Sequence, residues 1–187
     1  MADSKSDSII DGHFATKVGD NPLWQHACQV YSQAGVEKAL LQLQDQHGAD
    51  INLILQAVWL ASKGIEWTPA CIPTDYGKWV EEHVIPIRIM RRRLKTDWVE
   101  QRDLIYEDFR QQVKALELKA EQYALAMLYQ QASIFLLKEP LRASLVDDTI
   151  GVQNTKEAQI MSRLNLTNLA QYLTIPAELL LTTLVIY

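Results

Sequence analysis

The apolar positions along this chain recur at intervals of three and four residues, which is the spacing of one face of an α-helix. The first such segment follows Asn21, which can cap a helix, and Pro22, which suits the first helical position because it lacks an N–H. It predicts a helix that ends at Gly35. A second predicted helix runs from about Val36 to His47, where Gly48 is a suitable stop.

The segment from Ile51 to Ala61 is apolar on nearly every side, and Asn52 and Gln56 are its polar exceptions. Asp50 is the expected cap of this third helix. A helix that is apolar on most sides belongs at the centre of a bundle. We therefore expect this segment to be the central element and Trp59 to be buried, with the next two helices wrapped around it.

A fourth predicted helix begins at Thr74-Asp75 and ends near Lys95. Its expected apolar face consists of Trp79, His83, Ile87, Met90 and Leu94. Pro86 lies inside this pattern, where it removes one backbone hydrogen bond and crowds the carbonyl of Glu82, so we expect a kink. The preceding segment, Ile65 to Pro73, is predicted to be a loop whose Trp67 covers a groove.

The longest periodic segment comes next and predicts a helix of roughly 40 residues, about 60 Å long at 1.5 Å per residue. A break near Gln111-Gln112 is the alternative to one rod. The stripe that carries this prediction consists of Trp98, Arg102, Ile105, Phe109, Val113, Leu116, Ala120, Tyr123, Met127 and Ile134.

Two further helices are predicted, from about Lys156 to Leu173 and from Ala177 to Val185. The last is too apolar to stay in water, so we expect it to dock on its own bundle or on a second copy, which would make a homo-oligomer. Together these segments predict an all-α fold, a single bundle of about six or seven helices with one long helix. Residues 1–20 are predicted to be a flexible tail and residues 21–187 a single helical domain.

Composition narrows the function classes. Of 187 residues, 48% are hydrophobic, which excludes a fully disordered protein, and the net charge of −5 argues against a nucleic-acid binder. No apolar run reaches the length of a membrane span, and we expect a cytoplasmic location. The two cysteines, Cys28 and Cys71, are too few for a disulfide scaffold and are interpreted as reduced thiols packed like small apolar groups.

The strongest charge feature is the basic face of the fourth predicted helix. Its members differ by three, four and seven positions and therefore share one side: Arg88, Arg91, Arg92 and Lys95. Arg93 points elsewhere. This face either binds an anionic ligand or an acidic protein surface, or pairs internally with acidic residues of a neighbouring helix such as Glu117 and Glu121.

No residue pattern supports catalysis, a metal or a cofactor. The four histidines are widely separated, and Glu117 and Glu121 lack the Glu-x-x-His companion of di-metal bundles. His83 is expected to be a hydrogen-bonded core histidine. Phosphate loops, nucleophile elbows and zinc-protease motifs are also missing from the sequence.

Several stretches resemble a family of uncharacterised proteobacterial proteins: Asn21-Pro22-Leu23-Trp24, Gly48-Ala49-Asp50-Ile51-Asn52-Leu53, Trp59-Leu60-Ala61, Pro86 to Lys95 and Glu117 to Gln122. The resemblance covers about residues 20 to 140. It implies a small helical bacterial protein, and it supplies neither an activity nor site residues, since the family is a domain of unknown function.

The leading hypothesis is a non-enzymatic interaction or regulatory protein of the bacterial cytoplasm that binds a protein partner. The alternative is a small-molecule or anionic-ligand binder, or an enzyme, with a pocket between the fourth and fifth helices. Such a pocket would be lined by Trp79, His83, Glu117, Glu121 and Tyr123, with Arg91 beside them.

Overall fold

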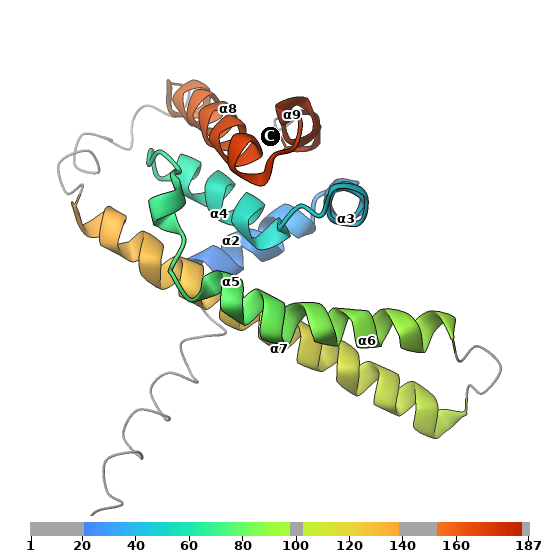
Figure 1. Cartoon of the computed structure of the whole chain (residues 1–187). Coiled ribbons are helices and arrows are strands. Elements are labelled where there is room, and N and C mark those ends of the chain that lie inside the picture. The colour runs from blue at the N-terminus through green and yellow to red at the C-terminus, as the bar shows by residue number, and fades with distance from the viewer. Residues whose placement is uncertain (1–20, 98–102, 139–152, 185–187) are drawn as a thin grey trace, which may run out of the picture.

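The computed structural model describes residues 21–97, 103–138 and 153–184, and these residues contain helices and no strand (Figure 1). The prediction of an all-α bundle with one long helix is therefore confirmed. The predicted tail, residues 1–20, lies outside the described residues, as does Trp98.

The helices follow the predicted order closely. Their bounds are α2 Pro22–Tyr31, α3 Val36–His47, α4 Ile51–Ser62, a 3₁₀ turn Pro69–Cys71, α5 Tyr76–Trp79, a π-helical segment Val80–Val84, α6 Ile85–Thr96, α7 Leu104–Lys138, α8 Gln153–Leu173 and α9 Ala177–Leu184. The caps expected from the sequence are present. The side chain of Asn21 accepts a hydrogen bond from the N–H of Trp24, and that of Asp50 accepts from those of Asn52 and Leu53.

Helix α4 is the centre of the fold, as its sequence predicts. Ten of its 12 residues are buried, including Trp59 at 3% exposure. Helices α8, α7 and α2 surround it. The fourth predicted helix wraps the core only at its start, where Tyr76 of α5 is buried, whereas α6 leaves the core and packs along α7 instead.

A buried polar cluster ties the segment after α4 to the core. Gln56 donates to the carbonyl oxygens of Cys71 at 2.9 Å and Leu128 at 3.1 Å, and its Oε1 accepts the indole N–H of Trp67 at 3.1 Å. Asn165 of α8 accepts from the backbone N–H of Trp67 at 2.8 Å. Trp67 lies in a loop, as predicted, and its side chain is fully buried, held by Gln56 of α4 and Asn165 of α8.

The continuous helix α5–π–α6 and the first half of α7 form an antiparallel hairpin that projects from the core, here called the arm (Figure 1). The sequence predicts a kink at Pro86, and the structure has a π-helical segment just before this residue, in which the N–H of Ile85 donates to Val80 O. A wider turn directly before a proline accommodates the missing N–H without ending the helix.

The apolar faces predicted for the arm are not buried. No residue of α6 is buried, and Met90 is 48% exposed. On α7, Ile105, Phe109, Leu116 and Ile134 are exposed. Helical periodicity identifies residues that share a face, but among the described helices only α6 lies beside the first third of α7.

Farther along α7, the buried face coincides only in part with the predicted stripe. Val113 and Ala120 belong to both, whereas Glu117, Ala124 and Leu128 are buried one position after the predicted Leu116, Tyr123 and Met127. Leu125, Ala126 and Ala132 are buried as well. The helix runs from Leu104 to Lys138 without the alternative break near Gln111-Gln112.

The C-terminal helix docks on its own chain. Leu180 and Leu184 of α9 are buried in the same cluster as α3, α4 and α8 residues. No helix among the described residues is long and apolar enough to cross a membrane. Both cysteines are unpaired, and the expectation that both are packed inside holds for Cys71 but is wrong for Cys28, which is exposed.

Candidate functional site

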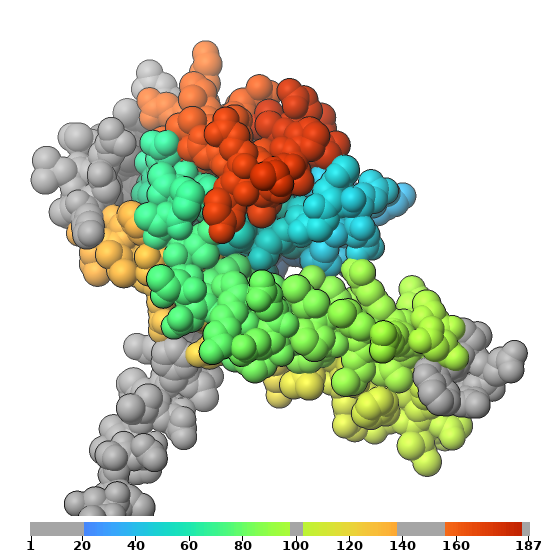
Figure 2. Space-filling view, viewed as in Figure 1, coloured from blue at the N-terminus to red at the C-terminus, as the bar shows by residue number. Residues whose placement is uncertain are grey.

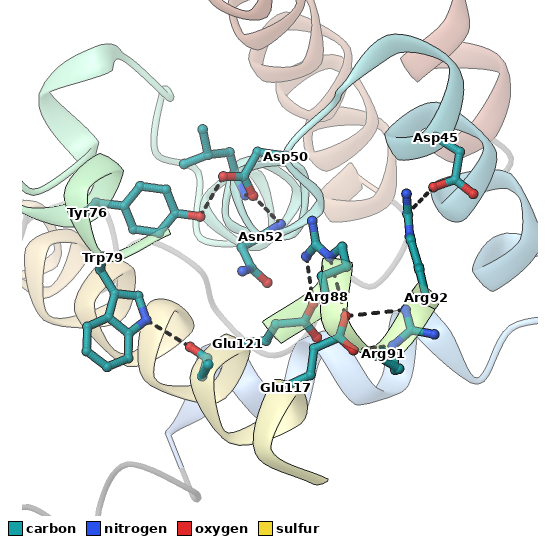
Figure 3. A network of polar contacts seen from close by, with 12 residues as sticks. Asp45, Asp50, Asn52, Tyr76, Trp79, Arg88, Arg91, Arg92, Glu117 and Glu121 are labelled. Carbon is teal, nitrogen blue, oxygen red and sulfur yellow. Dashed lines mark hydrogen bonds and ion pairs between the residues drawn. The ribbon is translucent and has the colours of Figure 1, made fainter. Parts of the chain in front are cut away.

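The basic face of α6 meets two glutamates of α7 at the base of the arm (Figure 3). Nη2 of Arg88 lies 2.7 Å from Oε1 of Glu121, and Nε of Arg88 lies 3.4 Å from Oε1 of Glu117. Arg91 pairs with Glu117 through Nε to Oε2 and through Nη2 to Oε1, the latter at 3.3 Å. The structure thus brings Arg88, Arg91, Glu117 and Glu121 together in one network.

This network is largely withdrawn from water. The side chains of Glu117 and Arg88 are 7% and 17% exposed. Burial raises the pKa of Glu121, and the hydrogen bond and charge of Arg88 offset this only in part. Because a buried charge without its partner is costly, Arg88 and Arg91 are used to neutralise the glutamates. Both arginines therefore serve to join α6 to α7.

The remaining basic residues of α6 lie nearer to solvent. Arg92 pairs with Asp45 of α3, and both side chains are about half exposed, at 48% and 54%. Lys95 is exposed. Arg93, on another side of the helix, is exposed and forms no ion pair within the described ranges.

The aromatic residues of the predicted pocket fill the space between the helices. The ring of Trp79 lies 4.2 Å from that of His83 and 4.3 Å from that of Tyr123, centroid to centroid. The indole N–H of Trp79 donates to Ala120 O at 3.0 Å. His83 is exposed, so the expected core histidine is a surface residue whose ring lies against the indole of Trp79 at an interplanar angle of 57°. These rings pack on one another, and the cavities described below are lined by other residues.

A second polar contact, between the starts of α4 and α5, was predicted only in part from the sequence. Asp50 was predicted as a helix cap, but its Oδ2 also accepts the hydroxyl of Tyr76 at 2.8 Å. Burial raises the pKa of Asp50 despite the hydrogen bonds that favour its charged form. Burial, together with the charge of Asp50, raises the pKa of Tyr76 as well. The contact ties the start of α4 to the start of the arm.

The outer surface of the arm is apolar and was missed because its residues were expected to be buried. Ile85, Ile89 and Met90 of α6 are each between 39% and 48% exposed. An open groove of about 330 Å³ runs along this side of α6, and it is lined by Pro86, Ile89, Met90, Arg93 and Leu94. Figure 2 shows how far the arm stands out from the rest of the molecule.

The tip of the arm continues this apolar character on α7. Leu104 is 91% exposed and Ile105 is 80% exposed, with Phe109 one turn farther on. Within the described residues, no group of three or more His, Cys, Asp or Glu side chains is placed to hold a metal ion.

A family model described as "Protein of unknown function (DUF2390)" matches residues 22–128. The chain belongs to this family. The family resemblance seen in the sequence is thereby confirmed as one to a domain of unknown function. No curated protein matches the chain, and neither does any solved structure.

The DUF2390 segment contains α2 to α6 and α7 as far as Leu128. It therefore includes the whole described arm, the Arg–Glu network and the central helix. Helices α8 and α9 lie beyond it, and they supply Asn165 and the buried leucines of α9.

Proposed function

We propose that this DUF2390 protein is a non-enzymatic interaction or regulatory protein that binds a protein partner through the outer face of its arm. The observation that supports this is α6, which has apolar side chains at Ile85, Ile89 and Met90 and buries none of its residues. A contiguous exposed apolar patch on a projecting element is typical of a docking surface. The ion pairs to α7 hold this surface in place.

The charge of α6 indicates what kind of partner fits. Between Ile85 and Thr96 the helix carries five cations and no acidic residue. Arg88 pairs with Glu117 and Glu121, Arg91 with Glu117, and Arg92 with Asp45. Arg93 lines the groove instead. We infer that the partner presents an amphipathic helix whose apolar stripe lies in the groove and whose acidic flank faces Arg93.

The location follows as part of the same proposal. Both cysteines are unpaired, and one of them is exposed. Exposed free thiols are typical of a reducing compartment. We place the protein in the bacterial cytoplasm, which fractionation of the native cells would test.

The experiment compares proteins retained by the immobilised full chain and by three variants. Ile89→Asp puts a charge into the apolar groove, and Arg93→Glu reverses the charge at its edge. Ile160→Asp is the matched control, because Ile160 is 60% exposed on α8, a helix that packs on α4 and α9. We expect one protein to be retained by the wild type and by Ile160→Asp, lost with Ile89→Asp and weakened with Arg93→Glu.

The retained protein must also have the proposed acidic flank. Its binding should weaken as the salt concentration is raised, because salt screens the attraction between that flank and Arg93. Equal retention by the wild type and by Ile89→Asp would contradict docking on the arm. Light scattering tests whether a second copy of the chain occupies the groove. If the wild type is a dimer and Ile89→Asp is a monomer, the occupant is a second copy, and the proposal of an acidic partner is wrong.

A further inference from the structure

The groove along the outer side of α6 combines apolar walls with an unpaired cation. Ile89, Met90 and Leu94 line it together with Arg93, which forms no ion pair within the residues that the structure describes. Its volume of about 330 Å³ is roughly twice that of an engineered cavity that holds one benzene ring. The groove therefore has room for two apolar side chains, and it suits a short apolar motif with acidic neighbours.

Such a motif occurs in this chain before α2. Residues 7–11 read Asp-Ser-Ile-Ile-Asp, so an aspartate flanks the two isoleucines on each side, and Phe14 follows. Residues 1–20, which lie outside the described residues, contain four aspartates and two lysines, a net charge of −2. Helix α6 carries five cations and no acidic residue. The charges of the two segments are therefore complementary.

The chain is long enough to bring this motif to the groove. Helix α2 packs on α7, and its last residue, Tyr31, lies near the base of the arm, where burial and in second place the charge of Glu121 raise the pKa of its hydroxyl. Helix α2 is about 15 Å long. The residues between Ile10 and Asn21 extend to about 35 Å. The remaining length, about 20 Å, exceeds the 10–12 Å diameter of a helix, so the motif reaches the outer side of α6.

A second cavity, of about 280 Å³, lies between α2, α4, α8 and α9 beside His26 and is a poorer match for this motif. Val58 and Leu184 are among its apolar walls, and no lysine or arginine is among the described residues that line it. Aspartates brought to this cavity would lose hydration without meeting an opposite charge. The charge of Arg93 therefore favours the groove on the arm.

We propose that segment 7–14 docks in the arm groove of its own chain. Its two isoleucines contact Ile89 and Met90, and one of its aspartates faces Arg93. Because this is the groove to which we assign a protein partner, the segment covers that site in the free protein and the partner has to displace it. This regulation rests on the proposed function, whereas the docking of the segment does not.

The test is a paramagnetic broadening experiment on the full chain. A nitroxide spin label is attached at Ser8→Cys after the exposed Cys28 has been replaced by serine, and the buried cysteine stays unlabelled. We expect the methyl signals of Ile89 and Met90 to be lost, and that of Ile160, 60% exposed on α8, to remain. Both lost signals should return as the salt concentration is raised, because salt screens the attraction to α6.

Variants on both sides of the contact identify its residues. Replacing Ile9 and Ile10 by serine removes the apolar anchors outside the described fold and should restore the signals of the groove. Ile89→Asp should restore the signal of Met90 in the same way. Ile160→Asp is the matched control, and the signal of Met90 should stay lost in this variant.

Binding of the partner tests the regulation separately. With the groove covered for nine-tenths of the time, the serine variant should bind the partner about tenfold more tightly than the wild type. Equal affinity of the two proteins would overturn the regulation and leave the proposed function standing. Broadened groove signals in a chain that retains no partner would contradict the proposed function and still support the docking.

Two results would overturn the docking. The first is an unchanged methyl signal of Met90 in the spin-labelled wild type, which would show that the groove is not covered by the segment. The second comes from a mixture of spin-labelled chains without isotopes and isotope-labelled chains without the spin label. Loss of the Met90 signal in that mixture would show that the segment comes from a second copy.

Discussion

Arg88 and Glu121, 33 residues apart in the chain, place Nη2 and Oε1 2.7 Å from each other and so join α6 to α7 at the base of the arm. Glu117, one turn earlier on α7, contacts both Arg88 and Arg91. No residue of α6 is buried, so α6 is held along α7 by these ion pairs and by the hydroxyl of Tyr106, which donates to Leu94 O, while Trp79 contacts α7 from α5. The stability of the arm is therefore expected to depend on charge.

The first prediction concerns the Arg91–Glu117 pair. Arg91→Ala and Glu117→Ala should each lower the free energy of unfolding, because each leaves a partly buried charge without one partner. The double variant should lose less than the sum of the two, with a coupling energy of about 0.5–3 kcal/mol. Denaturant melts of the four proteins measure this value.

The exposed pair between Arg92 and Asp45 is the control for that cycle. Its side chains are about half exposed, at 48% and 54%, so its coupling energy should be below about 1 kcal/mol. Strictly additive losses for Arg91→Ala and Glu117→Ala would contradict a direct interaction between them.

A second prediction uses Asp50, the partly buried carboxylate at the start of α4. Asp50→Asn should raise the free energy of unfolding at pH 7. The amide oxygen still accepts from the N–H groups of Asn52 and Leu53, its NH₂ can donate to the hydroxyl of Tyr76, and the desolvated charge is gone. Asp50→Ala should instead cost about 0.5–2 kcal/mol, because the cap is lost.

The effect of Asp50→Asn should depend on pH with a definite sign. The pKa of Asp50 in the folded protein is raised above its ordinary value of 3.8, so the folded state binds the proton more tightly than the unfolded state. Wild-type stability contributed by this group therefore rises as the pH falls through the raised pKa toward 3.8. The advantage of the asparagine variant should shrink over the same range. An advantage that stays constant between neutral pH and pH 4 would show that the charge is not the cause.

A third prediction concerns the central helix. Trp59 is buried and its ring centroid lies 5.6 Å from that of Tyr129 on α7. Trp59→Ala should cost about 3–5 kcal/mol, the range for truncating a large core aromatic. Leu118→Ala, at an exposed position of α7, should change stability by less than about 0.5 kcal/mol. Similar urea midpoints for the two variants would be inconsistent with α4 as the core.

The fourth prediction separates docking of α9 on its own chain from docking on a second copy. Deleting residues 176–187 removes the buried side chains of Leu180 and Leu184, each of which contributes about 1.5–3 kcal/mol. For a chain of this size the Tm should fall by roughly 10 °C. The elution volume of the wild type should correspond to a monomer if α9 serves only its own bundle. An unchanged Tm after the deletion would contradict the docking.

Helix caps, glycine stops and apolar periodicity in the sequence were enough to predict the helices and to identify α4 as the central helix. Asn21 and Asp50 are caps because their side chains accept hydrogen bonds from N–H groups two or three residues away. Gly48, at φ +65°, ends α3 in a conformation that costs a glycine little. The burial of α4 follows from its composition, since a helix without a polar side has to be surrounded.

The candidate site was predictable in its parts. The spacing of Arg88 and Arg91 placed them on one side of a helix, and Glu117 and Glu121 on one side of another, so internal pairing was one of the two readings. The sequence did not decide between pairing and ligand binding, because that depends on which helix lies opposite. The groove beside Ile89 was missed because the apolar residues of α6 were expected to be buried, and the cavity beside His26 was missed because it is a space between four helices.

The sequence by itself thus determined where helices begin and end and which residues share a face, because these depend on contacts within about one turn. Only the tertiary structure decided what each face meets. Trp67 is buried because Asn165, 98 residues later, accepts from its backbone N–H, and Met90 is exposed because α6 packs on α7 away from the core. Periodicity defines a face but carries no information about its neighbour, which depends on contacts between residues far apart in the chain.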